Sequence, residues 1–318
     1  MSAEQLAEVS DLFVVAAVLL YVVAMVAFAM DLAFGRVRPG KAVAKSAARQ
    51  PVAVGASGAD VLPETGSTSV PVAPEPPRLA AVAGTAGLVL AWVGWVANLA
   101  AIVTRGLAVG RWPWGNMYEF VVAISFAAVT AFLATQLRHN VRFLGGFVMV
   151  TAALGLGLAS KIFYTAAGPV VPALDSYWIA IHVTAAIVAS GLLTLAGVTG
   201  ILYLVRGDGM SRLPSRADLE RVAHRAIVFA FPLWTFAVIA GALWADRAWG
   251  RYWGWDPKEV WSFITWVAYA AYLHAKATAG WKGRAATIVQ LVAFGCLLFN
   301  LIGVNIFIDG LHSYADVD

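Results

Sequence analysis

The sequence predicts an all-α polytopic membrane protein with about eight transmembrane helices and both termini on the extracytoplasmic side. Hydrophobic residues make up 61% of the 318 residues and charged residues only 13%, about half the charged fraction of an average soluble domain. The apolar residues fall in long runs, and a helix needs about 20 of them to cross the hydrocarbon core of a bilayer. The basic residues form short clusters between these runs, so the net charge of +4 indicates topology signals and not nucleic-acid binding.

The first expected helix, at 12–34, is separated from a seven-helix core at 80–318 by the segment 36–79. That segment is rich in Pro, Gly, Ser, Val and Ala and has no amphipathic period, so we interpret it as a disordered cytoplasmic linker. The core helices carry scattered Gly and Ala, which favour close packing of helices in a membrane. They are expected at 80–104, 117–136, 143–160, 178–205, 225–245, 258–276 and 285–307.

The distribution of Lys and Arg predicts the orientation of these helices. With the N-terminus outside and eight spans, 16 of the 22 Lys and Arg residues lie in the inner segments and six in the outer segments. Cytoplasmic segments carry such an excess. The first apolar run is too long for the core of a cleavable signal peptide, and an acidic stretch precedes it. The single cysteine, Cys296, provides neither a disulfide framework nor a CxxC pair.

An unusual concentration of aromatic residues occurs in the expected external loop at 245–260. Six of the 13 tryptophans fall within the 23 residues from 244 to 266. An aromatic belt at the membrane interface would account for Trp261 and Trp266, but it accounts less well for the aromatic residues of the loop itself. Because glycines alternate with these rings and let a ligand approach the backbone closely, the loop is typical of a platform for a flat ligand. A platform for a sugar would be expected to carry more carboxylates and amides. The loop residues are Trp249, Tyr252, Trp253 and Trp255.

The motif "DPKE" directly after these rings predicts where the next helix begins. Asp256 can cap the helix, Pro257 suits its first position, and Glu259 completes a capping box.

Three of the five histidines are candidates for ligand binding. His182 and His312 lie at the outer ends of expected helices, on either side of the aromatic loop in sequence. His274 lies 17 residues beyond Pro257, which is roughly 25 Å deeper along a helix. A single helix histidine is usually explained by a hydrogen bond, but an ionisable group within a span indicates function. Heme iron takes axial histidines, whereas zinc would require about four ligands at a closer spacing.

The stretch "WGRYWGWDPKEVWSFITW" at 249–266 resembles the tryptophan-rich WWD signature of heme-handling proteins in cytochrome c maturation. Over residues 105–315 the chain resembles the CcsA/ResC-type cytochrome c synthesis proteins of system II. The segments that carry this second resemblance are "RWPWGNMYEF" at 111–120, "PALDSYWIAIHV" at 172–183, "YAAYLHAKA" at 269–277, "GWKGRAA" at 280–286 and "GVNIFIDGLHSYA" at 303–315.

The resemblance implies a role for each of the residues singled out above. It implies that His182 and His312 are the axial ligands of heme b at the external face. It implies that His274 binds heme within the membrane, with a second ligand from a partner protein. The residues that the resemblance implies pack against the heme are Trp249, Tyr252, Trp253, Trp255 and Asp256.

The function implied is the transport of heme to the external face and its presentation for thioether attachment to a CxxCH apocytochrome c. The chain would be half of a synthase, a heme lyase, with a ResB-type membrane partner. Thiol-reducing proteins would act upstream, and the location would be the bacterial cytoplasmic or plastid thylakoid membrane. Two alternatives stay open. One is a heme exporter or chaperone of the ABC-linked system I type that does not form the bond. The other is a structural subunit without porphyrin.

Overall fold

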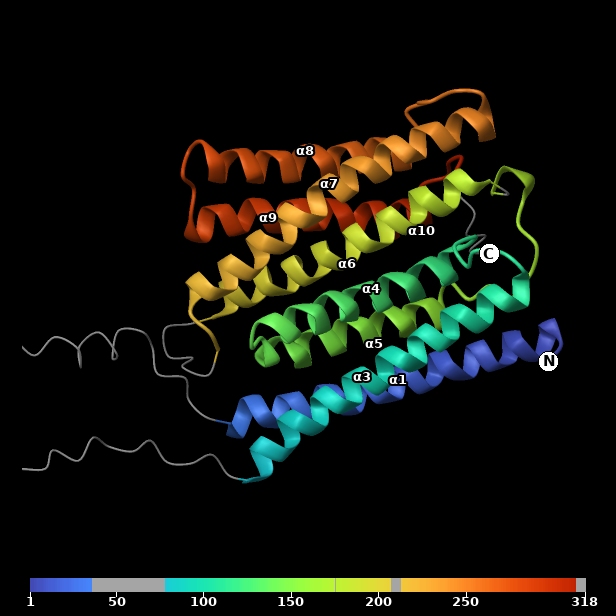
Figure 1. The fold of residues 1–318 in the computed structure, drawn as a ribbon. Helices are drawn as coiled ribbons and strands as arrows, with labels where there is room; N and C mark the ends of the chain where they lie inside the picture. The colour runs from blue at the N-terminus through green and yellow to red at the C-terminus, as the bar shows by residue number, and fades with distance from the viewer. Residues whose placement is uncertain (36–77, 175, 207–212, 313–318) are drawn as a thin grey trace, which may run out of the picture.

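Long helices that run side by side form almost the whole of the described chain (Figure 1). The computed structural model describes residues 1–35, 78–174, 176–206 and 213–312, and these contain no strand. The eight long helices are α1 (Ala3–Phe34), α3 (Arg78–Val109), α4 (Met117–Arg138), α5 (Gly145–Lys161), α6 (Tyr177–Val205), α7 (Arg216–Trp249), α8 (Pro257–Ala277) and α9 (Gly283–Leu298). The short elements are the 3-10 turns η1 (Arg142–Leu144) and η2 (Pro172–Leu174), the π-helical turn η3 (Phe299–Gly303) and α10 (Val304–Phe307).

Seven helical segments in the described residues are long and apolar enough to cross a membrane, so the prediction of a helical, polytopic integral membrane protein is confirmed. They correspond to the expected helices other than α8. Helix α8 has 21 residues, but it is less apolar because it contains Lys258, His274, Lys276 and several Trp and Tyr. It nevertheless runs beside α7 and α9 between the same two ends of the bundle (Figure 1).

Two helices begin about nine residues earlier than the apolar runs indicate. Helix α1 begins at Ala3, where Ser2 and Gln5 form a capping box, and α7 begins at Arg216, where Ser215 is the cap. Both early segments are polar, so capping and propensity extend these helices beyond the apolar run. The expected linker at 36–79 falls almost entirely outside the described residues.

The buried core has two parts that share α6. In the first, α1 packs against α3 and α5, and α4 packs against α5 and α6. In the second, α6 packs against α7 and α9, and α8 packs against α9. Small residues permit the closest contacts: a Cβ at Gly94 would lie 2.6 Å from the ring of Tyr21. Burial of apolar side chains therefore fixes α6 between the two parts, and α6 is the helix that carries His182.

The connections divide cleanly between the two ends of the bundle (Figure 1). We call the end that carries the α7–α8 loop, residues 250–256, the loop end. The N-terminus of α1 and the α3–α4 and α5–α6 connections lie at the loop end, whereas the α4–α5 and α8–α9 connections lie at the opposite end. Helix α1 ends and α3 begins at the opposite end.

We predict that the loop end is extracytoplasmic, because the opposite end carries most of the basic residues. Reporter fusions after residues 60, 140, 215 and 280 should give cytoplasmic signals, and fusions after 110, 170, 250 and 316 should give extracytoplasmic signals. The pair at 250 and 280 tests directly whether α8 crosses the membrane. An extracytoplasmic signal at 60 or 215 would contradict the orientation, and signals on the same side at 250 and 280 would remove α8 from the spans.

Candidate functional site

The α7–α8 loop is fixed at both ends by backbone geometry and capping. Gly250 ends α7 in the left-handed conformation, with φ of 70°, which glycine adopts without strain. Asp256 caps α8 by accepting a hydrogen bond from the Lys258 amide at 3.2 Å. Glu259 accepts hydrogen bonds from the amides of Asp256 at 3.0 Å and Gly254 at 2.8 Å. The capping box predicted from "DPKE" is confirmed.

Asp256 also binds the segment that follows α10. Its Oδ1 accepts a hydrogen bond from the Leu311 amide at 2.6 Å, and its Oδ2 accepts one from His312 Nδ1 at 2.7 Å. Gly310 makes this approach possible, because a Cβ there would lie 2.7 Å from Asp256 Oδ1. The cap of α8 and the ring of His312 therefore depend on one carboxylate.

Asp256 is held in its ionised form. Burial would raise the pKa of the Asp256 carboxyl, but the hydrogen bonds from His312 and the Leu311 amide outweigh this effect and lower the pKa below its usual value. Because the pKa of Asp256 is lower in the folded protein than in the unfolded chain, its ionised carboxylate stabilises the fold at neutral pH. This stabilisation is lost only in acid, as the pH falls through the folded-state pKa.

His182, in the second turn of α6, is held by a backbone group of α7. Its Nδ1 lies 2.7 Å from the Ala237 carbonyl oxygen. Because a carbonyl oxygen can only accept, Nδ1 carries the proton in this contact. Gly241 leaves the room for the ring, since a Cβ there would lie 2.7 Å from His182 Cε1.

The two histidines therefore share a hydrogen-bonding pattern suited to metal ligation. In each ring Nδ1–H is engaged by a fixed acceptor, and no hydrogen bond to the Nε2 of either ring occurs among the described residues. Metal-binding histidines typically donate their second ring N–H to a carboxylate or a carbonyl, which fixes the tautomer and the orientation of the ring. His182 and His312 match these two forms, and each leaves its Nε2 lone pair available.

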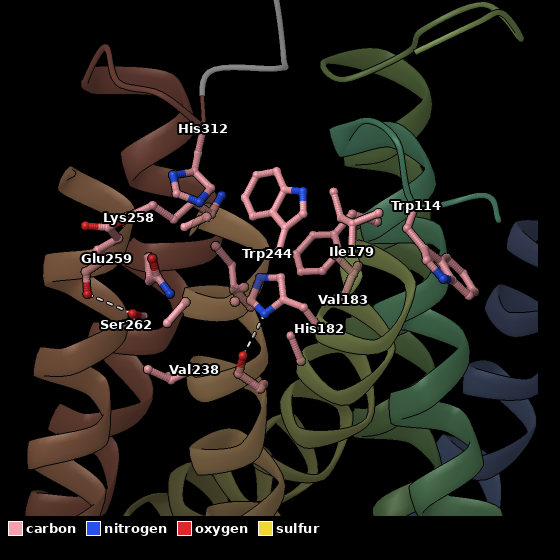
Figure 2. Close-up of a pocket in the computed structure, with 18 of the residues that line it drawn as sticks. Trp114, Ile179, His182, Val183, Val238, Trp244, Lys258, Glu259, Ser262 and His312 are labelled. Carbon is pink, nitrogen blue, oxygen red and sulfur yellow. Dashed lines mark hydrogen bonds between the residues drawn. The ribbon is translucent and has the colours of Figure 1, made fainter. Parts of the chain in front are cut away.

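Both imidazoles lie against the buried ring of Trp244 (Figure 2). The ring centroids of His182 and Trp244 are 6.3 Å apart and the rings are nearly parallel, at 5°. The centroids of His312 and Trp244 are 5.7 Å apart. His312 also makes an edge contact with Trp249, at 4.9 Å between centroids. The two histidines thus share an aromatic wall at the loop end of the bundle.

A cavity between the two parts of the core brings these groups together (Figure 2). Its walls come from the start of α4, from α6 and α7, from the α7–α8 loop, and from α8 and η3. Most of the lining is apolar or aromatic. The lining includes Trp114, His182, Trp244, Tyr252, Trp253, Lys258, Asn300 and His312.

Some of the remaining predicted residues line the cavity, and others lie at the surface. Tyr252 and Trp253 line the cavity, as a ligand platform requires. Trp255 does not: its side chain is 69% exposed, it contacts Trp253 edge-on, and its φ is 58°, an uncommon conformation for a bulky residue. His274 is exposed in the last turn of α8, at the opposite end from the cavity (Figure 1).

Sequence reasoning missed a buried ionic cluster beside the cavity. Glu119 accepts hydrogen bonds from Arg105 Nε at 3.0 Å, Arg111 Nη1 at 2.9 Å and the Gly115 amide at 2.8 Å. This cluster holds the α3–α4 connection, which places Trp114 in the cavity wall. The stretch "RWPWGNMYEF" contains a charged residue at each end of an aromatic turn, which was the available signal.

Fold and site together define a class: a multi-span helical membrane protein with two oriented histidines beneath a tryptophan-rich loop. A family model described as "Cytochrome C assembly protein" matches residues 114–312, a span that contains the loop and all three candidate histidines.

Similar proteins agree with this match. The chain is 32% identical to the cytochrome c biogenesis protein CcsA of Synechococcus elongatus over 288 residues, covering 73% of this chain and 87% of that protein. It is 33% identical to CcsA of Chlamydomonas reinhardtii over 217 residues, covering 65% and 62%. It is 30% identical to CcsA of Gloeobacter violaceus over 285 residues, covering 68% and 84%. The chain belongs to the cytochrome c assembly protein family.

Proposed function

We propose that this chain binds heme b at the loop end, with His182 and His312 as axial ligands, and presents it for attachment to CxxCH apocytochrome c. The observation that carries the proposal is the shared orientation of the two rings: each Nδ1–H is fixed and each Nε2 is available. Heme iron accepts axial histidines, and the aromatic lining of the cavity suits a porphyrin. Trp249 contacts His312, and Tyr252 and Trp253 line the cavity. Trp255 lies at the exposed rim.

The attachment reaction depends more on the positions of the reacting thiol and vinyl groups than on the chemistry of the protein's side chains. Each cysteine S–H of the apocytochrome adds across one vinyl C=C bond of the heme: the sulfur bonds to one carbon and a proton goes to the other. No oxidant or reductant is consumed, but the thiols must be reduced beforehand, hence the thiol-reducing proteins upstream. The chain would hold the porphyrin ring in one orientation and prevent other orientations, which is catalysis by positioning.

His274 has a separate role in this proposal, as a ligand that heme meets within the membrane. Its side chain is exposed on α8, on the same outward face as the exposed Phe263 and Val267, and no hydrogen bond to it occurs among the described residues. Ionisable residues within membrane helices rarely face lipid and usually pair with a partner group. We infer that a ResB-type membrane partner covers this face and supplies the second ligand, so that the two chains together form the system II synthase.

We predict that His182→Ala and His312→Ala each remove one axial ligand of the external heme. The low-spin bis-histidine absorption of the external heme should be lost, and cytochrome c assembly should fall by at least about tenfold. Added imidazole should restore part of both, because it can occupy the vacated axial position. His224→Ala is the matched control, since His224 contacts Tyr272 at the opposite end. Normal spectra and normal assembly in both variants would exclude these ligands.

We predict that His274→Ala acts before the external site. Because heme would not be received within the membrane, heme per mole of purified complex should fall several-fold, the external heme included. The His182 and His312 variants should instead retain membrane-bound heme. Val267→Ala on the same face of α8 is the control. Full heme content and normal assembly in the His274 variant would show that delivery follows another route.

A further inference from the structure

The cavity wall contains a charged side chain whose function the axial ligands do not explain. Lys258, in the first turn of α8, lines the cavity on the side of α8 and η3, and Trp114 lies on the far side of the cavity (Figure 2). Its Nζ donates one hydrogen bond, to Asn305 Oδ1 at 2.8 Å. An ammonium group has three donors, and a cation beside apolar walls favours an anionic partner.

The neighbouring carboxylates direct their hydrogen bonds to other groups, although the charge of Asp256 is close enough to act on Lys258. Asp256 accepts hydrogen bonds from His312 and from the Leu311 amide, and Glu259 accepts two amides of the loop. No salt bridge to Lys258 occurs among the described residues. The contact with Asn305 therefore orients the ammonium group without neutralising it.

A second polar group of the cavity wall also lacks a partner. Asn300 is 3% exposed, lines the cavity, and its Oδ1 has no hydrogen-bond partner in the described part of the chain. It lies in the π-helical turn η3, and π-helical turns occur frequently at functional sites. An unsatisfied buried amide is costly, and rotation of the amide can direct either its oxygen or its N–H₂ into the cavity.

We propose that Lys258 and Asn300 form a carboxylate subsite, which binds an acidic group on the edge of the planar ligand and so sets its rotation in the cavity. This inference rests on the proposed function and assigns the propionate edge of heme to the side of α8 and η3. The opposite edge of the ring, which carries the vinyl groups, then faces Trp114. The site would select porphyrins with free carboxylates over their neutral esters.

The test compares two probes on the purified full-length chain: iron(III) protoporphyrin IX and its dimethyl ester. Absorbance titrations should show that the wild-type chain binds the diacid about ten- to a hundredfold more tightly than the ester, the range for one charge-assisted hydrogen bond. In Lys258→Met the two affinities should become nearly equal, through weaker binding of the diacid. Lys258→Arg should keep the preference, because it keeps the charge.

Two further variants separate recognition from folding. Asn300→Asp, nearly isosteric, should weaken binding of the diacid and leave the ester unaffected. Lys161→Met removes an exposed lysine at the same end of the bundle and should match the wild type. The ratio of the two affinities within one variant does not depend on the fraction that folds. Equal binding of both probes by the wild type, or an unchanged preference in Lys258→Met, would overturn the subsite. If the wild type bound neither probe, the proposed function itself would be contradicted, and the subsite with it.

Discussion

The carboxylate of Asp256 joins two segments at the loop end, the start of α8 and the turn after α10. It caps α8, receives the Leu311 amide and orients His312. Because these contacts share two oxygen atoms, the α7–α8 loop and the turn after α10 behave as one unit. The lowered pKa of Asp256 keeps this unit intact at neutral pH. Loss of the charge would weaken the charge-assisted hydrogen bond that orients the imidazole, whereas a neutral oxygen at this position can still cap α8.

The opposite wall of the cavity depends on helix packing. His182 reaches the Ala237 carbonyl only because Gly241 allows α6 and α7 to approach closely. One histidine is thus fixed from α7 and the other from the loop, and Trp244 lies against both rings. Sites built on packed helices hold their groups more accurately than sites on loops alone. The site accordingly requires both the α6–α7 contact and the Asp256 contacts.

Much of the fold could be predicted from the sequence because the bilayer imposes a minimum apolar length on each helix. The helix starts at Ala3 and Arg216 were missed because polar, capped turns extend beyond the apolar runs. The capping box was predictable because its contacts are local. The Asp256–His312 contact joins residues 56 positions apart, which spacing alone does not reveal. In the sequence, Trp244 can be explained as part of an aromatic belt, Lys258 as a topology signal and Asn300 as an ordinary helix residue. Only tertiary packing shows that the three line one cavity.

The most direct test of this account is the heme affinity of Asp256→Asn. Asparagine still caps a helix, so the unfolding midpoint should stay near that of the wild type. The neutral amide, however, cannot provide the charged acceptor for His312 Nδ1. Loss of such an orienting contact typically lowers metal affinity about ten- to a hundredfold, and the heme spectrum should lose its bis-histidine character. Asp309→Asn, at an exposed position of the same segment, is the control and should behave as the wild type. Wild-type affinity with an unchanged spectrum in Asp256→Asn would contradict the central role of this carboxylate.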